Sequence, residues 1–416
     1  MESTSANALA QELLDHCLAA RPWPEHLLDP LIAEPGNSAL FRIVVERLGD
    51  LFEPRLCRVY ADLFADVIAR RIPELHSEHL VARYERIRLP RLHLPNRDRK
   101  EAVSGIDREP ATVFVLSRVT LGADVAITSV LLDAAKQRFP NSQICFVGPH
   151  KSWELFAADA RLRHLPVAYG RSGTLDDRLS IWPQLRQAVC QPNSIVIDPD
   201  SRLTQLGLLP ICPEEDYYFF ESRAYGADSD ESLSALARRW AAETLGIADA
   251  QPYIEVGQRH ALPSHISAYA TTVSLGVGEN PDKRIADPFE QDLLEQLPRP
   301  ILIDKGAGGE EATRVERAVS RAGAGITMWE GSFAGFAAHI QKSKLYVGYD
   351  SAGGHVAAAC GVPLLSIFAG FASARMFHRW RPSGPGPIEV IRADVKQVDN
   401  LLADCQSALK KLSMLG

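Results

Sequence analysis

The sequence has few of the features that mark disulfide-bonded or metal-binding proteins. Its seven cysteines are scattered and form no C-x-x-C pair, and several lie in apolar runs, as Cys145 does in QICFVG. Cysteines in such a setting are typical of reduced core residues rather than of disulfides or a zinc site. No residues elsewhere have the spacing of metal ligands. We therefore predict a cytoplasmic protein that holds no metal and needs no cofactor.

Long apolar runs and a basic amino-terminal stretch are also missing. No run reaches the roughly 18 apolar residues that suggest a membrane span. The opening residues, MESTSANALAQELL, lack the basic start of a signal peptide. A net charge of −7 argues against a general role in binding nucleic acid. The remaining composition, 46% hydrophobic and 23% charged over 416 residues, is that of a globular protein with two or three domains.

Strand patterns are absent from residues 1–105, which we predict to form a helical extension. Apolar residues recur there at three- and four-residue spacing, with prolines between the repeats. The repeats cover residues 6–18, 38–51 and 54–72. The last part, residues 83–100 (RYERIRLPRLHLPNRDRK), is locally basic. We interpret it as a solvated linker with Pro90 and Pro95 as spacers. The alternative is a surface that approaches an anionic acceptor or a membrane, which would allow peripheral membrane association.

From about residue 106 the pattern changes to strands that alternate with helices. Apolar runs of strand length, such as TVFVL, are separated by segments with helical spacing. This alternation predicts parallel, doubly wound sheets, whose functional groups lie at the carboxyl ends of the strands. We divide the pattern into two such domains, residues 106–264 and 265–416. The predicted strands are residues 112–116, 143–147, 194–197, 217–220, 272–277, 300–304, 326–329, 345–347 and 364–368.

The most distinctive stretch is KLYVGYDSAGGHVAAACGVPLLSIFAG, at residues 344–370. It reads as a strand, a turn at residues 350–355 (DSAGGH), a helix of small residues and a further strand. The free backbone N–H groups and the dipole of a helix that starts at such a turn make an anion-binding site. Ser351 adds a hydroxyl, while Asp350 and His355 add titratable groups. The alternative is a purely structural turn with a capping aspartate.

The same stretch resembles the nucleotide-sugar site of the family 9 glycosyltransferases, the relatives of ADP-heptose:lipopolysaccharide heptosyltransferase. The shared features are an Asp-Ser/Thr-Gly-x-x-His turn, followed by Ala-Ala-Ala and Gly-x-Pro, although Ala352 replaces the usual glycine. Three further motifs of the family occur in order between about residues 110 and 400. The resemblance implies the GT-B fold, in which two Rossmann-like domains face a cleft that holds the active site. The helical extension is absent from the simplest members of the family.

The first of these motifs is the polar turn after the strand at 112–116. It contains Leu-Gly and an aspartate, and Arg-Phe-Pro follows the next helix. The resemblance implies that Asp124 is the general base for the acceptor hydroxyl. Ala123 is an insertion relative to the family and would move this carboxylate by a few ångströms. The alternative is an acid in the first helical turn, favoured by the helix dipole; Asp198 and Asp200, after a neighbouring strand, are then the next candidates.

The other two motifs lie on the donor side. Lys283 and Arg284 match the start of a Lys-Arg/His-Trp-Pro motif, but Ile285 and Ala286 replace its end. The resemblance implies that Lys283 contacts the donor diphosphate, whose negative charge grows as the glycosidic bond breaks. Glu310 matches a glutamate that binds the ribose hydroxyls; alternatively it is an ordinary acid at a helix start. The glycine-rich loop before it lacks the Gly-Lys-Ser/Thr of a P-loop, so an ATPase is not supported.

These observations predict an inverting, metal-independent glycosyltransferase. It would move a sugar from a nucleotide-diphosphate sugar to a hydroxyl of a carbohydrate, glycolipid or protein acceptor, with Asp124 as the base. The residues predicted to bind the donor are Lys283, Glu310, Asp350, Ser351, Ala352, Gly353, Gly354 and His355. Two alternatives stay open: a nucleotide-sugar epimerase with the same fold, and a non-catalytic protein that binds nucleotide sugars.

Overall fold

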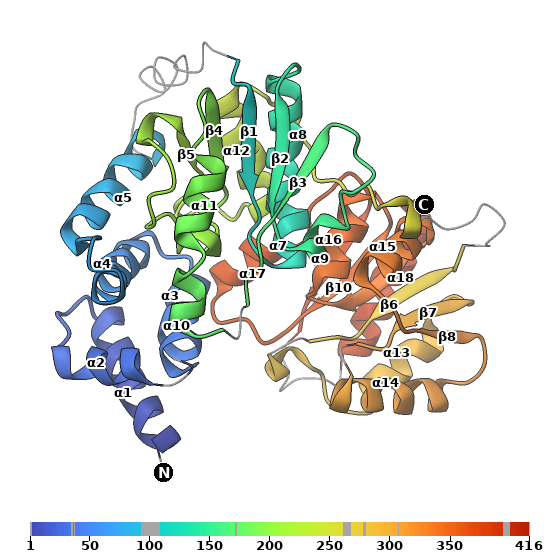
Figure 1. Cartoon of the computed structure of the whole chain (residues 1–416). Helices are drawn as coiled ribbons and strands as arrows, with labels where there is room; N and C mark the ends of the chain where they lie inside the picture. Colours follow the sequence, from blue (N-terminus) through green and yellow to red (C-terminus); the bar gives the residue numbers. More distant parts are fainter. Residues whose placement is uncertain are drawn as a thin grey trace.

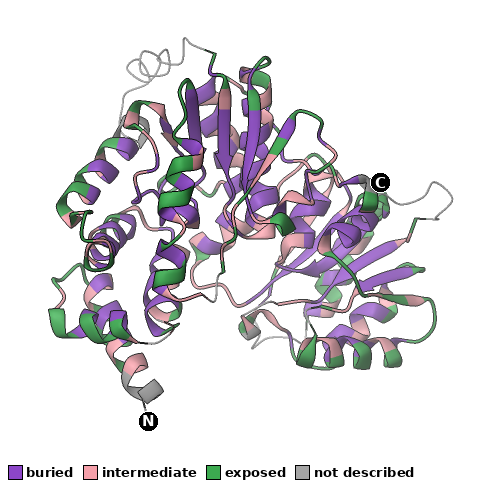
Figure 2. Cartoon of the chain, viewed as in Figure 1, coloured by how far each residue is buried: buried purple, intermediate pink, exposed green. Residues whose placement is uncertain are grey.

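The chain folds into a helical extension and two α/β domains (Figure 1). The structure, a computed structural model, describes residues 2–34, 36, 38–92, 109–170, 173–260, 268–277, 280–306, 308–393 and 400–415. The extension lies beside the first α/β domain, and the second α/β domain lies below the first one in Figure 1. The inner strands of both sheets are buried, while the outer faces of the surrounding helices are exposed (Figure 2).

The first sheet has five parallel strands in the order β3-β2-β1-β4-β5. Four of them are continuous apolar runs, because both faces of such a sheet are covered by helices. The exception is β3, whose sequence LRHLP is too polar to predict as a strand. The strands are β1 (Thr112–Leu116), β2 (Gln143–Gly148), β3 (Leu162–Pro166), β4 (Ser194–Asp198) and β5 (Tyr217–Phe219).

The second sheet has six parallel strands in the order β11-β10-β9-β6-β7-β8. The prediction of two parallel doubly wound sheets is therefore correct. The edge strand β11, with the sequence IEVIR, was not predicted; it is short, partly exposed and lacks the continuous apolar run of the inner strands. The strands are β6 (Thr271–Ser274), β7 (Ile301–Asp304), β8 (Ile326–Trp329), β9 (Tyr346–Tyr349), β10 (Leu364–Phe368) and β11 (Ile388–Arg392).

Helices and short helical turns connect the strands of both domains. Those of the first domain are α7 (Leu121–Ala123), the π-helix η2 (Asp124–Thr128), α8 (Ser129–Arg138), α9 (His150–Trp153), α10 (Leu175–Leu179), α11 (Trp182–Val189), η3 (Arg202–Thr204), η4 (Glu214–Asp216) and α12 (Leu233–Leu245). Those that follow are η5 (Gln258–His260), η6 (Pro281–Lys283), α13 (Phe289–Gln296), α14 (Gly309–Ala322), α15 (Phe333–Lys342), α16 (Ala352–Ala359), α17 (Ala374–Trp380) and α18 (Leu401–Leu415).

Each sheet has one point where the strand order reverses. This point lies between β1 and β4 in the first sheet and between β6 and β9 in the second. In open α/β sheets, ligands bind outside the carboxyl ends of the strands at such a point. The turn at residues 350–355 directly follows β9, so the strongest sequence motif lies at the reversal point of the second sheet.

The extension is helical, as predicted, and shares its core with the first domain. One apolar cluster joins Phe64 and Tyr84 of the extension with Phe114 and Phe219 of the first sheet. The rings of Tyr84 and Phe219 lie 6.0 Å apart between centroids. The division at residues 105 and 106 stays a prediction, but these two parts are packed as one body. The elements are α1 (Glu2–Leu18), α2 (Glu25–Ala33), the π-helix η1 (Leu40–Val45), α3 (Glu46–Asp50), α4 (Pro54–Arg71) and α5 (Ser77–Leu92).

The prediction of a linker at residues 83–100 is wrong over residues 83–92, and residues 93–100 lie outside the described residues. The structure continues α5 to Leu92. Arg83 donates to the carbonyl of Gly207 at 2.8 Å, and Arg88 donates to the buried carboxylate of Glu221 at 3.0 Å. Contacts with the first domain thus hold a helix where the local sequence favours a linker. Arg83 and Arg88 of the basic segment are therefore used for internal contacts.

A pair of arginines on α5 tests how firmly the extension is fixed. Arg88 and its partner Glu221 are 9% and 2% exposed, whereas Arg86 and its partner Glu214 are 59% and 36% exposed. We expect Arg88→Ala to lower the free energy of unfolding by about 3–5 kcal/mol, because it leaves a buried carboxylate unpaired. Arg86→Ala is the matched control and should cost at most about 1 kcal/mol. Urea unfolding measures both, and equal costs would contradict the integrated packing.

Candidate active site

The turn after β9 presents an uncapped helix start. Ser351 is the N-cap of α16, with extended backbone angles (φ −154°, ψ 171°), yet its hydroxyl accepts no capping hydrogen bond. The hydroxyl instead lies 3.3 Å from the phenol oxygen of Tyr346. The first N–H groups of a helix need an external partner when no side chain caps them. The helix start therefore retains the hydrogen-bonding capacity to hold an anion.

Lys283 is brought to this turn from a distant part of the chain. Its Nζ lies 2.6 Å from a carboxylate oxygen of Asp350 and 3.4 Å from the carbonyl oxygen of the same residue. The loop at Gly370 supports it: Gly370 has φ +64°, and a Cβ there would lie 2.5 Å from the carbonyl carbon of Asp282. The structure thus places Lys283 beside the start of α16, where the sequence motifs predicted that the two would meet.

The glycines of the turn allow α16 to lie close to β9. A Cβ on Gly353 would lie 2.2 Å from the hydroxyl of Tyr346, so no side chain fits at this position. A Cβ on Gly354 would have Pro382 Cγ as its nearest neighbour at 3.5 Å, which is ordinary contact. Only the first of these two glycines is therefore required by packing. Ala352 takes the place of the family's glycine at the first position of the helix.

His355 lies between the two domains. It is 7% exposed, and its ring lies 6.0 Å from the ring of Trp380. Gly122 of the first domain approaches it so closely that a Cβ there would lie 3.2 Å from His355 Cδ2. Burial lowers the pKa of His355, and the charge of Asp350 opposes this shift. A neutral, packed imidazole here supports the start of α16 from the side of the first domain.

Glu310 and its neighbour Glu311 lie at the start of α14, after β7. Glu310 is exposed. Glu311 points inward: its Oε1 accepts a hydrogen bond from the backbone N–H of Val277 at 3.1 Å, and its carboxyl group packs on Gly306. Sequence reasoning did not single out Glu311. The pattern of two adjacent acids at a helix start does not show which of them faces the sheet.

Asp124 lies at the facing edge of the first sheet and has no exposed surface. Its carboxylate accepts hydrogen bonds from Ser117 Oγ (2.7 Å), the backbone N–H of Arg118 (2.7 Å) and Thr128 Oγ1 (2.8 Å). Burial raises the pKa of Asp124, and these hydrogen bonds oppose the shift. Here the carboxylate joins the end of β1 to the following helix. Its predicted role as a base stays a prediction.

The backbone after Ala123, which is predicted to be an insertion, departs from a regular α-helix. Residues Asp124–Thr128 form the π-helix η2 between α7 and α8. A π-turn holds more residues than an α-turn, and such turns occur frequently at functional sites. A local widening of the helix at this place is what the predicted insertion would produce, and the insertion itself stays a prediction.

The two alternative acids, Asp198 and Asp200, are also fully buried. Asp198 accepts hydrogen bonds from Thr204 Oγ1 (2.5 Å) and the hydroxyl of Tyr217, and burial raises its pKa to about 6. Asp200 forms a two-point ion pair with Arg223, at 2.9 Å and 3.0 Å. Both carboxylates organise the loop after β4 and offer no free oxygen to a substrate.

The second domain holds the first through α17. Arg379, which is 1% exposed, donates to the carbonyls of Ala227 (2.9 Å), Ser229 (2.7 Å) and Glu231 (2.8 Å). Arg375 adds an ion pair with Asp228 at 2.6 Å. This set of contacts fixes the loop at residues 227–231 against α17. The relative position of the two facing edges is therefore set by buried hydrogen bonds.

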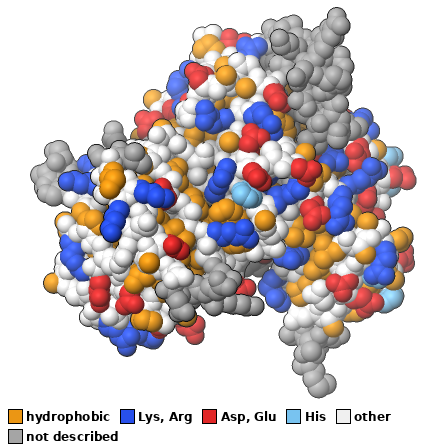
Figure 3. Space-filling model, turned by 180° about the vertical axis from the view of Figure 1, so that it is seen from behind, with side chains coloured by type: hydrophobic (Ala, Val, Ile, Leu, Met, Phe, Trp, Pro, Cys, Tyr) orange, Lys and Arg blue, Asp and Glu red, His pale blue; other side chains and the backbone are white. Residues whose placement is uncertain are grey.

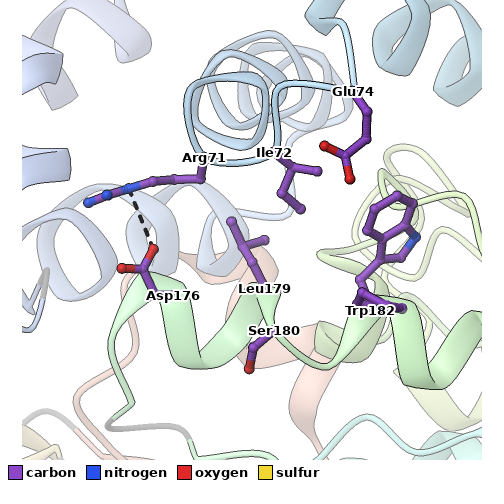
Figure 4. A pocket seen from close by; sticks show the side chains of 8 residues that line it. Arg71, Ile72, Glu74, Asp176, Leu179, Ser180 and Trp182 are labelled. Atoms are coloured by element: carbon purple, nitrogen blue, oxygen red, sulfur yellow. Dashed lines mark ion pairs between the residues drawn. The ribbon is translucent and has the colours of Figure 1, made fainter.

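A pocket lies elsewhere, between the end of α4 and helices α10 and α11 (Figure 4). An ion pair of 3.6 Å between Arg71 and Asp176 crosses its rim. None of its lining residues is among those predicted from the sequence. They are Arg71, Ile72, Glu74, Asp176, Leu179, Ser180, Trp182 and Pro183.

Acidic and basic side chains are interspersed over the face shown in Figure 3. Within the described part of the chain, no group of three or more His, Cys, Asp or Glu side chains is placed to hold a metal ion.

Among the helices that the structure describes, none is long and apolar enough to cross a membrane. All seven cysteines are free thiols.

Comparisons with known proteins find a family similarity over one segment of the sequence and a similarity of fold over most of the chain. The family model described as Glycosyltransferase family 9 (heptosyltransferase) matches residues 310–385. The structure of E. coli heptosyltransferase WaaC with ADP covers 72% of this chain and 99% of its own, at 18% identity and a TM-score of 0.51. A family 9 glycosyl transferase from Veillonella parvula covers 72% and 89%, at 16% identity and a TM-score of 0.51. No curated protein sequence matches the chain.

These matches confirm the predicted GT-B fold and the resemblance to family 9. The segment matched by the family model contains Glu310 and the turn at residues 350–355, but it contains neither Lys283 nor Asp124. The assignments of individual residues therefore stay predictions.

Two neighbouring glycines test the packing of the donor turn. We expect Gly353→Ala to lower the free energy of unfolding by about 1–3 kcal/mol, because the added methyl overlaps the hydroxyl of Tyr346. Gly354→Ala is the matched control; it should be neutral or stabilise by up to about 1 kcal/mol, since alanine favours a helix. Thermal unfolding of both variants measures the difference. Two variants with the same stability would contradict this geometry.

Asp124→Ala tests the role of the buried carboxylate. The change leaves Ser117, Thr128 and the N–H of Arg118 without their acceptor, so we expect it to lower the free energy of unfolding by at least about 2 kcal/mol. Chemical unfolding measures this loss. A fully stable variant with lost turnover would instead favour the predicted role as a base.

Proposed function

We propose that this chain, a GT-B protein with a family 9 segment in its second domain, is a nucleotide-sugar glycosyltransferase. One observation carries the proposal. Lys283 meets Asp350 at the uncapped start of α16, and this start lies at the reversal point of the second sheet, opposite the turn of the first domain. A cation and a free helix start at one point form a site for a diphosphate.

The diphosphate of the donor would lie on the start of α16. Ser351 offers its hydroxyl, and the backbone of residues 352–355 offers N–H groups, apart from that of Gly354, which donates to the carbonyl of Ser351 at 3.2 Å. Lys283 has three hydrogen-bond donors on Nζ, so it can keep its bond to Asp350 while it contacts a phosphate oxygen. As the glycosidic bond breaks, the leaving diphosphate gains negative charge, which the lysine and the helix dipole stabilise. This arrangement supports a reaction that does not depend on a metal.

The ribose of the donor would be held by Glu310. A carboxylate at this edge can accept hydrogen bonds from both hydroxyls of a ribose. Glu310 is exposed and free to do so, while Glu311, one position further along α14, is used to brace the loop at Val277. The two adjacent acids would therefore have different roles: Glu311 holds the loop at Val277 in place, and Glu310 would contact the ribose.

The sugar would pass to an acceptor hydroxyl that enters from the first domain, with inversion at the anomeric carbon. Direct attack from the side opposite the leaving group requires an acceptor on the facing edge, which is the arrangement that two facing domains provide. The acceptor class is a carbohydrate, a glycolipid or a protein. The free cysteines favour a reducing compartment, and we place the reaction in the cytoplasm.

The two alternatives are separated by one assay. The chain is incubated with ADP-, UDP- and GDP-sugars, with and without oligosaccharide acceptors, and the products are identified. A transferase gives a glycoside or slow hydrolysis of the donor, while an epimerase gives a new nucleotide sugar. Binding without any turnover would indicate a non-catalytic protein and would contradict the proposal.

Donor binding is tested by removing one charge at a time. We expect Lys283→Ala and Glu310→Ala each to weaken the binding of a nucleoside diphosphate by about 1–3 kcal/mol, or roughly 5- to 150-fold. Arg284→Ala is the matched control, because Arg284 pairs with Asp287 at 2.7 Å instead of with the turn. Calorimetry with ADP, UDP and GDP measures the affinities. Unchanged affinity in both test variants would contradict the proposed pocket.

A further inference from the structure

The helical extension places one acidic side chain close to where the two domains meet. Asp50 is the last residue of α3 and is half-buried. The charges that act on it belong to Glu46 and Arg47 of its own helix, to Arg202, which follows β4, and to Lys283 of the second domain. Asp50 therefore lies within electrostatic reach of both facing edges, including the lysine assigned to the donor diphosphate.

Packing holds this position in place. Phe52, two residues after Asp50, packs edge-on against Trp380 of α17, with 6.3 Å between ring centroids. Its carbonyl accepts a hydrogen bond from Arg375 Nη1 at 3.4 Å. On the other side, a Cβ on Gly49 would lie 3.8 Å from Arg223 Cδ. The end of α3 is thus fixed between the loops of the first sheet and a helix of the second domain.

Asp50 differs from the other acids at this edge of the first sheet. Asp124, Asp198 and Asp200 are fully buried, and each accepts hydrogen bonds from side chains around it. Asp50 retains exposed surface, and none of the described residues donates a hydrogen bond to its carboxylate. Of these four aspartates, Asp50 is the one that is partly exposed and that accepts no hydrogen bond from the described residues.

The position is unfavourable for an acid. An aspartate in the last turn of a helix lies at the negative end of the helix dipole. Burial raises the pKa of Asp50 to about 6, and Glu46 adds to this shift, while Arg202 and Lys283 oppose it. A carboxylate whose charge lowers the stability of the fold, at a place where two domains meet, is typical of a functional group. A base works best when its pKa lies near the working pH.

We propose that Asp50 of the helical extension is the general base that accepts the proton of the attacking hydroxyl. This inference rests on the proposed function of the donor site. It gives the extension a chemical role: the extension supplies to the first domain an acid that faces the donor, while Asp124 positions the turn of that domain.

The proposed step is balanced without a further reactant. The O–H bond of the acceptor breaks, its proton passes to the carboxylate of Asp50, and the oxygen forms the new bond to the anomeric carbon. The bond from that carbon to the diphosphate oxygen breaks, and its electron pair leaves with the nucleoside diphosphate beside Lys283. Asp50 then releases the proton to water.

The test uses the full chain and follows the release of nucleoside diphosphate from ADP-, UDP- and GDP-sugars, with water or an oligosaccharide as acceptor. We expect Asp50→Asn to lower the turnover number by about 10²–10⁴-fold. Nucleoside diphosphate affinity should stay within about threefold, since the donor is held by the other domain. Asp50→Glu keeps a carboxylate and should retain part of the turnover. Wild-type turnover should fall as the pH drops below about 6, and Asp50→Asn should lack this decline.

Asp62→Asn is the matched control. Asp62 is also half-buried, burial also raises its pKa, and it lies on α4 of the same extension. The charges that act on it, from Arg58, Glu85 and Asp66, all belong to the extension rather than to the gap. Its variant should keep wild-type turnover. Equal losses in both variants would mean that the extension merely needs its acids to fold, and would overturn the proposal.

The melting temperature gives a second readout, which distinguishes a functional from a structural role of Asp50. Because the folded pKa of Asp50 lies above its ordinary value, the folded chain carries an unfavourable charge above about pH 6 and loses it by protonation at lower pH. Asp50→Asn should therefore melt at a higher temperature than the wild type at about pH 8, and this difference should vanish near pH 4. A variant that melts lower at about pH 8 would assign Asp50 a structural role instead.

The failures of the two proposals are distinguishable. Wild-type turnover with an unaffected Asp50→Asn variant overturns the role of Asp50 alone and leaves the glycosyltransferase in place. If Asp124→Asn then loses turnover while it keeps its stability, Asp124 is the base. A wild type that binds nucleoside diphosphates but releases none from any sugar overturns both proposals.

Discussion

The close approach of α16 to its neighbours is the constraint on which the rest of the site depends. Its first turn has no room for a side chain against β9, because the hydroxyl of Tyr346 occupies the space beside Gly353. On its other side, Gly122 of the first domain lies against His355. One helix start is therefore in contact with both domains. The backbone that would hold the donor diphosphate is fixed relative to the edge from which an acceptor would attack, and this fixed distance is what a direct displacement requires.

The charged side chains at the edges of the two sheets differ in how they are paired. At the edge of the first sheet, three carboxylates are buried and satisfied by hydroxyls, a backbone N–H or an arginine, as Asp200 is by Arg223. Such groups hold loops in place and are expensive to expose, because an unpaired buried charge costs several kcal/mol. The edge of the second sheet differs, since Lys283 forms an ion pair with Asp350 and keeps 19% of its side chain exposed. The carboxylates at the edge of the first sheet thus hold loops in place, and the edge of the second sheet can bind an anion. Under the proposal, proton transfer is then carried out by Asp50, which belongs to the helical extension.

The sequence predicted the elements whose signal is local. The continuous apolar runs of β1 and β10 and the turn at residues 350–355 could be recognised because their patterns lie within a few residues. Strand β3 and helix α5 could not, because buried ion pairs and neighbouring strands hold them against their local preference, as Arg88 shows for α5. The meeting of Lys283 with the turn was implied by family resemblance alone. Asp50 had no signal in the sequence: its significance comes from charges on three separate elements, which only the folded chain brings together.

The extension is best understood as part of the site rather than as an added module. Its helices share an apolar core with the first sheet, and Arg88 pairs with Glu221 inside that core. The turn between α3 and α4 extends from this core to the second domain, where Phe52 packs on Trp380. A segment needed only to stabilise the first domain would have no reason to contact α17. It would also have no reason to end a helix with a half-buried aspartate, where the dipole and burial both disfavour the charge. Both features are accounted for if the extension completes the gap between the domains and supplies the acid that works there.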